Sequence, residues 1–253
     1  MLYTGLTSVT FRQLPAIEII ELAKKAQLDT IEWGGDVHVP PDNLSNASKI
    51  ARLTREAGLV VSSYGSYWRG DDISSFRPVL ATAQALAAPV IRIWAGATAS
   101  AALTKEKRSK LVHNLAEATR IAKAENITVA VEYHNDTLTD SLDSTKRLLI
   151  DTADVGLKSY WQPSFALSVA DNLAAIQVIA QRLANIHVFS WLQTTRLPLA
   201  DHADLWQQYI NALSQIQGDR YMLLEFVKND APEQFIEDAK VLKQWLSKQK
   251  GCY

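Results

Sequence analysis

The stretch Thr128-Val-Ala-Val-Glu-Tyr-His134 decides the fold, because it is a short β-rich run with polar groups near its end. Side chains alternate along a strand, so Glu132 and His134 share one face. The other face carries Val129, Val131 and Tyr133 and suits packing against helices. Both polar groups are therefore predicted to point inward, away from the helices.

Short runs of this kind alternate with longer segments of helical period eight times along the chain. The predicted strands are Tyr3 to Thr7, Thr30 to Trp33, Val60 to Tyr64, Val90 to Trp94, Thr128 to His134, Val155 to Trp161, Asn185 to Phe189 and Tyr221 to Val227. The 253 residues divide into about 32 per unit, as expected for a (β/α)8 barrel of roughly 250 residues. No Pro/Gly/Ser-rich linker and no G-x-G-x-x-G interrupts the series. We therefore predict an α/β fold, a single TIM barrel domain over residues 1–253.

Composition narrows the partners and the compartment. The formal net charge is −1, from 26 basic and 27 acidic residues, which argues against nucleic acid as the main partner. The single cysteine, Cys252, excludes an internal disulfide and a cysteine-based metal site. Neither a signal peptide nor a membrane span is recognisable, so we expect a cytoplasmic protein without a membrane partner.

Polar residues at the carboxyl ends of the predicted strands are the candidates for chemistry, because barrels of this kind place their sites there. The last four strands supply Glu132, Gln162, His187 and Glu225. Two carboxylates, an imidazole and an amide oxygen suit a divalent cation such as Mn, Co, Mg or Zn. The alternative is a buried hydrogen-bonded network without a metal.

Five segments carry a resemblance to a known family. They are Ile31-Glu-Trp-Gly-Gly-Asp-Val-His38, Ser63-Tyr-Gly-Ser-Tyr67, Val131-Glu-Tyr-His-Asn135, Ile186-His-Val188 and Leu224-Glu-Phe226. Together they resemble the xylose-isomerase-like TIM barrels, which include sugar phosphate isomerases and epimerases, ketose 3-epimerases, hydroxypyruvate isomerases and inosose dehydratases. The likeness spans nearly the whole chain.

The resemblance implies a metal held by Glu132, Gln162, His187 and Glu225, with the two glutamates as the acid/base pair. The sequence departs from the family at strand six, where an Asp followed three residues later by His is typical. Here those positions hold Gln162 and Phe165. Gln162 keeps an oxygen ligand but removes a negative charge, so we expect weaker affinity for a hard cation.

The function that this resemblance implies is isomerisation or epimerisation of a sugar or sugar phosphate by proton transfer through a metal-stabilised enediolate. The enzyme would be an aldose-ketose isomerase or a ketose epimerase of carbohydrate metabolism. The alternatives are an inosose-dehydratase-like lyase and a catalytically silent sugar-binding barrel. A homodimer is expected only by analogy with similar barrels.

The predicted substrate-binding residues come from loops and strand ends on the same side of the barrel. They are His38, Tyr64, Tyr67, Arg92, Trp94 and His134. For Arg92 an ion pair with the buried acid Glu32 is an equal alternative. The loops after strands seven and eight contain no glycine, and a phosphate could be bound there only through Arg196 or Lys228. Whether the sugar is phosphorylated therefore stays open.

Overall fold

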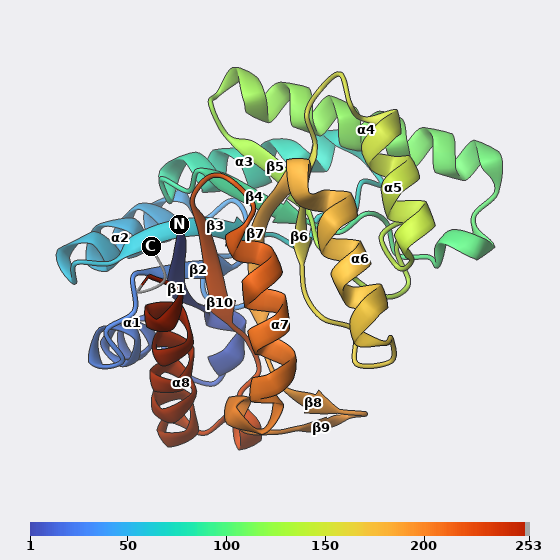
Figure 1. The fold of residues 1–253 in the computed structure, drawn as a ribbon. Coiled ribbons are helices and arrows are strands. Elements are labelled where there is room, and N and C mark those ends of the chain that lie inside the picture. The colour runs from blue at the N-terminus through green and yellow to red at the C-terminus, as the bar shows by residue number, and fades with distance from the viewer. Residues whose placement is uncertain (251–253) are drawn as a thin grey trace.

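Eight parallel strands close into a barrel in the computed structural model, which describes residues 1–250 (Figure 1). Around the barrel the strand order is β1-β10-β7-β6-β5-β4-β3-β2. The strands are β1 (Leu2–Thr7), β2 (Thr30–Gly34), β3 (Val60–Gly65), β4 (Val90–Ile93), β5 (Thr128–Val131), β6 (Lys158–Trp161), β7 (Leu183–Val188) and β10 (Arg220–Leu224). The predicted TIM barrel is confirmed, while Cys252 lies outside the described residues.

Each barrel strand is followed by a helix that packs on the outside of the barrel (Figure 1). The helices are α1 (Ala16–Lys25), α2 (Leu44–Glu56), α3 (Phe76–Ala85), α4 (Lys105–Ala124), α5 (Leu142–Asp151), α6 (Val169–Ile179), α7 (Ala203–Ser214) and α8 (Pro232–Lys250). Side-chain caps fix where several of them begin. Asn43, Thr104 and Ser168 each accept a hydrogen bond from the backbone N–H three residues later. Among residues 1–250, no helix has the length and apolar character that a membrane span requires.

Four predicted strands are longer than the observed ones. β4 ends at Ile93, not Trp94, and β10 ends at Leu224, not Val227. The other two differences have local causes. β5 ends at Val131, not His134, because the Glu132 carbonyl accepts a hydrogen bond from Thr139 Oγ1 and leaves the ladder. β6 begins at Lys158, not Val155, because Gly156 adopts a left-handed conformation with φ 85° and turns the chain. The side chains after β5 therefore stand at the rim of the barrel.

A small hairpin was not predicted. It is formed by β8 (Trp191–Leu192) and β9 (Thr195–Arg196), which pair antiparallel in the connection between β7 and α7. Figure 1 shows it projecting beside the start of α7. Its two strands are too short to give a periodic signal in the sequence.

The inside of the barrel has an apolar floor below a polar centre. Ala130, Tyr160 and Leu223 form a separate buried cluster there. Gly5 makes room for it, because a Cβ at this position would lie 2.6 Å from Leu223 Cδ2. Tyr160 connects the floor to the polar centre, since its hydroxyl donates a hydrogen bond to Glu32 at 2.9 Å.

Candidate active site

Glu32, on β2, is a completely buried carboxylate inside the barrel. Three hydroxyl groups donate to it: Thr7 Oγ1 at 3.2 Å, Ser63 Oγ at 2.7 Å and Tyr160 OH at 2.9 Å. Burial raises its pKa, but Arg92 and His187 lower the pKa by more, so the net pKa is below the ordinary range. Glu32 is therefore an anion at the centre of the barrel.

Arg92, on β4, connects this anion to the predicted catalytic Glu132. Its Nε donates to Glu32 Oε1 at 2.9 Å, and its Nη1 donates to Glu132 Oε2. Trp94 Nε1 donates to the same Glu132 oxygen at 2.8 Å. The alternative in which Arg92 pairs with Glu32 is confirmed, and its role as a direct substrate ligand stays a prediction. Glu132 Oε2 is thus occupied, which leaves Oε1 for other partners.

The four predicted metal ligands meet around one atom, Nδ1 of the fully buried His187. This nitrogen lies 2.9 Å from Gln162 Oε1, 3.4 Å from Glu225 Oε2 and 3.8 Å from Glu132 Oε1. On the other side of the ring, Nε2 lies 3.3 Å from Glu32 Oε1. An ionised carboxylate only accepts hydrogen bonds, so Glu32 holds the proton on Nε2 and directs Nδ1 toward the other three groups.

These residues fit a divalent cation. Glu132, His187 and Glu225 offer ligand atoms within 4.8 Å of one another. Burial raises the pKa of Glu225, so its anion lacks sufficient compensation from the protein. Burial lowers the pKa of His187, but Glu225 and Glu32 raise it by more, so the net pKa is above the ordinary value of a histidine. A ligating histidine with a carboxylate on its other nitrogen is the usual arrangement in metal sites.

The charge of the side chain at position 162 is expected to control the affinity of this site for a cation. Glu132 and Glu225 balance a divalent ion, whereas Glu32 is balanced by Arg92. Gln162→Glu keeps the side-chain shape and adds one negative charge, so the affinity for Mn²⁺ is expected to rise on the order of tenfold. Titration with Mn²⁺ monitored by calorimetry measures the change. Gln177→Glu, on the exposed side of α6, is the matched control, and an unchanged affinity in Gln162→Glu would contradict this ligand assignment.

Three further predicted substrate residues lie at the rim, above Glu132. Trp94 contacts the rings of His134 and Tyr67, with centroids 4.3 Å and 6.1 Å away. His134 lies beyond the end of β5 and is half-buried against Trp94, and its Nδ1 lies 2.7 Å from the Asn135 carbonyl. Tyr67 accepts a hydrogen bond from Arg12 at 2.8 Å. These rings form one wall of the site.

His38 and Tyr64 are not brought to this centre. His38 is 7% exposed, and its ring nitrogens lie 3.0 Å from Ser8 Oγ and 3.1 Å from the Leu14 carbonyl. The Tyr64 hydroxyl donates to the Val39 carbonyl at 2.9 Å. The contacts of both residues indicate that they stabilise the loop after β2, and give no support to a role in substrate binding.

Replacing His38 is therefore expected to affect stability and not turnover. His38→Ala leaves buried polar partners unsatisfied, and the expected loss in the free energy of unfolding is about 1–3 kcal/mol. Urea unfolding measures this loss, and kcat/KM is expected to stay within about twofold of wild type. A large fall in kcat/KM with unchanged stability would instead support a role for His38 in substrate binding.

Sequence reasoning named Glu32 only as a partner for Arg92, and did not place Tyr160 or Ser63 in the centre. A signal for Glu32 was present, because it is the single acid within the buried run Thr30–Gly34. In the structure the ion-pair partner of Glu32 is Arg92.

Several solved structures share this fold at low sequence identity. A probable 3-DHS dehydratase, AsbF, from Bacillus anthracis has a TM-score of 0.81 at 19% identity, over 96% of this chain and 99% of that one. A D-psicose 3-epimerase from Clostridium cellulolyticum H10, solved with D-tagatose, has a TM-score of 0.73 at 13% identity, over 97% and 98%. A xylose isomerase domain protein from Planctomyces limnophilus has a TM-score of 0.72 at 12% identity, over 98% and 97%.

At such identities the likeness to these structures shows the fold alone. No curated protein sequence matches the chain. The family is shown by a different comparison, in which residues 20–245 match the family described as xylose isomerase-like TIM barrel. This match covers most of the chain, including every residue of the polar centre except those on β1. The protein belongs to the xylose isomerase-like TIM barrel family.

Proposed function

We propose that the protein is a divalent-metal-dependent isomerase or epimerase of a sugar or a sugar phosphate. One observation carries the proposal: Glu132 and Glu225, which follow different strands of the barrel, both lie close to His187 Nδ1 in the same buried centre, at 3.8 Å and 3.4 Å. Two carboxylates placed in this way can remove and return a proton on a bound substrate.

The surroundings of the two glutamates differ, and this difference suggests separate roles. Glu132 Oε2 accepts hydrogen bonds from Arg92 and Trp94, which hold this carboxylate in place. Within the described part of the chain, no arginine donates a hydrogen bond to Glu225, and burial raises the pKa of this carboxyl group. A carboxylate with a raised pKa accepts a proton more readily, so Glu225 is the proposed base that takes the proton from the carbon beside the carbonyl.

Return of the proton decides the product. Glu225 returning it to the neighbouring carbon, together with movement of the hydroxyl proton from one oxygen to the other, would give the aldose-ketose isomer. For the epimer, Glu225 would keep the proton that it removed, and a protonated Glu132 would donate a second proton to the opposite face of the same carbon. Glu132, Gln162, His187 and Glu225 would hold a divalent ion, whose positive charge would stabilise negative charge that develops on the substrate oxygens. Glu32 does not take part in proton transfer in this proposal, because its oxygens are already occupied by hydrogen bonds and by Arg92.

Solvent-proton exchange tests the proposal. Mn²⁺-loaded protein is incubated in D2O with a panel of ketoses, aldoses and their phosphates, and the products are examined by NMR and mass spectrometry. Incorporation of deuterium next to the carbonyl, with formation of an isomer or epimer, is expected. Loss of one water from the substrate would instead identify a lyase, which begins with the same proton abstraction. Binding of sugars without exchange in any of them would indicate a silent binding barrel.

A further inference from the structure

Three arginines surround the mouth of the barrel, and each lies over an aromatic ring. Arg12 lies 5.9 Å from the centre of the Phe226 ring, and Arg196 lies 4.7 Å from the same ring. Arg69 lies 4.3 Å from the centre of the Trp94 ring. Contact with aromatic faces holds guanidinium groups in defined positions and lowers the entropy that they lose on binding an anion.

Two of these arginines are already neutralised. Arg12 forms an ion pair with Asp36, and Arg196 forms one with Asp230. Within residues 1–250, the Arg69 side chain makes no ion pair and no hydrogen bond, although it is half-buried. The hydrogen-bond donors of the Arg69 guanidinium are thus free, and their fork geometry matches a carboxylate or a phosphate.

Arg69 stands directly beside the candidate active site. The Trp94 ring beneath it donates a hydrogen bond from Nε1 to Glu132 Oε2 at 2.8 Å. An anionic group bound to Arg69 would therefore be separated from the proposed proton-transfer centre by about the size of one indole ring. A short polyol could reach from one to the other.

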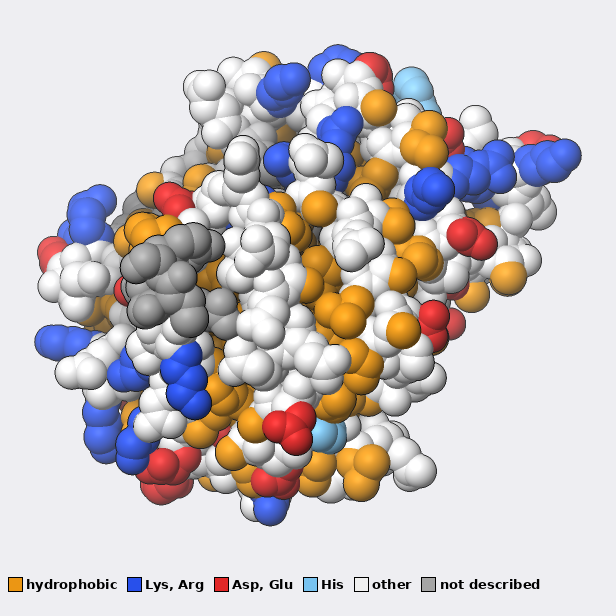
Figure 2. Space-filling model, in the orientation of Figure 1, with side chains coloured by type: hydrophobic (Ala, Val, Ile, Leu, Met, Phe, Trp, Pro, Cys, Tyr) orange, Lys and Arg blue, Asp and Glu red, His pale blue; other side chains and the backbone are white. Residues whose placement is uncertain are grey.

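A positively charged cleft continues from Arg69 away from the barrel axis. The cleft has a volume of about 310 Å³ and lies between the loops after β3 and β4 and the helix α4. Its charged lining residues are Arg69, Lys107, Lys110 and a single acid, Asp71. In Figure 2, Lys and Arg side chains gather over the N-terminal end of α4, where Lys105, Lys107, Arg108 and Lys110 lie.

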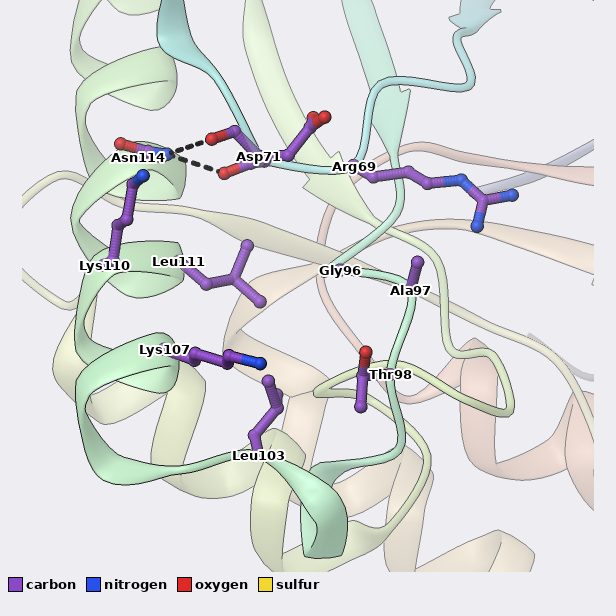
Figure 3. Close-up of a pocket in the computed structure, with 11 residues that line it drawn as sticks. Arg69, Asp71, Gly96, Ala97, Thr98, Leu103, Lys107, Lys110, Leu111 and Asn114 are labelled. Carbon is purple, nitrogen blue, oxygen red and sulfur yellow. Dashed lines mark hydrogen bonds between the residues drawn. The ribbon is translucent and has the colours of Figure 1, made fainter.

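The close-up of this cleft shows how the charges are arranged. Arg69 extends away from Lys107 and Lys110, and Lys107 points across the cavity toward Leu103 and Thr98 (Figure 3). The lysines are therefore placed to attract an anion through the local potential, while Arg69 makes the direct contact.

The loops that form the cleft require glycine. Gly70 and Gly96 adopt left-handed conformations, with φ of 78° and 95°. A Cβ would lie 2.5 Å from a Leu111 methyl at Gly70 and 2.8 Å from another at Gly96. Both loops thus pack closely on α4, which fixes the backbone from which Arg69 extends.

We propose that the substrate carries an anionic group, a carboxylate or a phosphate, which Arg69 binds at the entrance of this cleft. This inference rests on the proposed function, for which it specifies the class of substrate. The proposed anion would lie beside the loops that follow β3 and β4. The loops after strands seven and eight are less suitable, because Arg196 there is paired with Asp230.

Matched ligand pairs test the role of Arg69. Calorimetry on Mn²⁺-loaded protein compares D-fructose with D-fructose 6-phosphate, and D-glucitol with D-gluconate. The anionic member of at least one pair is expected to bind roughly tenfold or more tightly than its neutral partner. The phosphate pair and the carboxylate pair tell the two anionic groups apart. Equal binding within both pairs would overturn the inference.

Arginine variants make the test specific. Arg69→Gln is expected to abolish the preference for the anion, and Arg69→Lys to keep part of it, because lysine retains the charge but not the fork. Arg196→Gln removes a neutralised arginine of the same mouth and is expected to keep the preference. A preference that persists in Arg69→Gln would also overturn the inference. Absence of deuterium exchange would contradict only the proposed function, because the binding of these ligand pairs is measured without turnover.

Discussion

Glu225→Gln is expected to lower kcat by about 10²–10⁴-fold, the range that a positioned acid or base contributes. The amide has nearly the shape of the carboxylate, but it cannot accept a proton from carbon. The substitution also removes one negative charge from the candidate metal site, so part of any loss could come from a missing ion. Turnover is therefore measured at saturating Mn²⁺, and bound metal is quantified in the same samples.

The controls for Glu225→Gln separate chemistry from binding. Affinity for the substrate at saturating Mn²⁺ is expected to change far less than kcat, because Glu225 is assigned to proton transfer. Glu233→Gln, at an exposed position in the first turn of α8, is expected to have wild-type turnover. Wild-type turnover in both Glu225→Gln and Glu132→Gln would refute the assignment of the two glutamates.

The positions of the four candidate metal ligands could be predicted from the sequence because a barrel brings the carboxyl ends of its strands to one rim. Glu132, Gln162 and Glu225 directly follow β5, β6 and β10, and His187 is the second-last residue of β7. Strand order therefore places the four residues near one another. In the structure, side-chain oxygens of the other three lie 2.9 to 3.8 Å from His187 Nδ1. Their roles in catalysis remain a prediction.

Side chains alternate between the two faces of β3, and the sequence alone does not show which of Ser63 and Tyr64 faces the inside of the barrel. Ser63 points into the barrel and donates to Glu32, so Tyr64 must point outward, where its hydroxyl reaches Val39. A register shift between Ile31 and Glu32 aligns Glu32 with Ser63 across the two strands. Such a bulge leaves no pattern in the sequence, and the face of Ser63 could not be fixed without it.

Contacts between distant segments were also beyond prediction. Tyr160 donates to Glu32 across the barrel, with 127 residues between them in the chain. The sequence does not single out Arg69, because the lack of an ion pair at this residue depends on where every nearby acid lies in the fold. Local patterns predict strands, helices and rim positions, whereas the partner of a buried charge is decided by packing of the whole barrel.

Arg92→Met is expected to reduce the free energy of unfolding by about 3–5 kcal/mol, because it leaves buried carboxylates without their cation. Arg92 contacts both Glu32 and Glu132, and all three side chains are at most 6% exposed. Methionine fills a similar volume, so the loss reports charge more than packing. By contrast, Arg52→Met breaks an exposed pair with Glu56, for which a loss of about 0–1 kcal/mol is expected.

The stability difference between wild type and Arg92→Met is expected to depend on pH. In the wild type the pKa of Glu32 is lowered, so Glu32 contributes stability at neutral pH that is lost as the pH falls through that pKa. Without Arg92, burial is expected to raise the pKa of Glu32 above its unfolded value. Protonation of Glu32 in the variant then removes the unpaired negative charge. The difference in the free energy of unfolding between wild type and Arg92→Met should therefore become smaller as the pH is lowered from 7 to 5.

A double-mutant cycle with Glu32→Gln separates the ion pair from other effects of Arg92. Urea unfolding of the wild type, both single variants and Arg92→Met/Glu32→Gln yields the coupling energy. The double variant is expected to be less destabilised than the sum of the single variants, because the buried charge that Arg92 compensates is then absent. Strict additivity would mean that Arg92 stabilises the barrel through Glu132 or through packing, and that Glu32 is held as an anion by its hydroxyl donors and His187 instead.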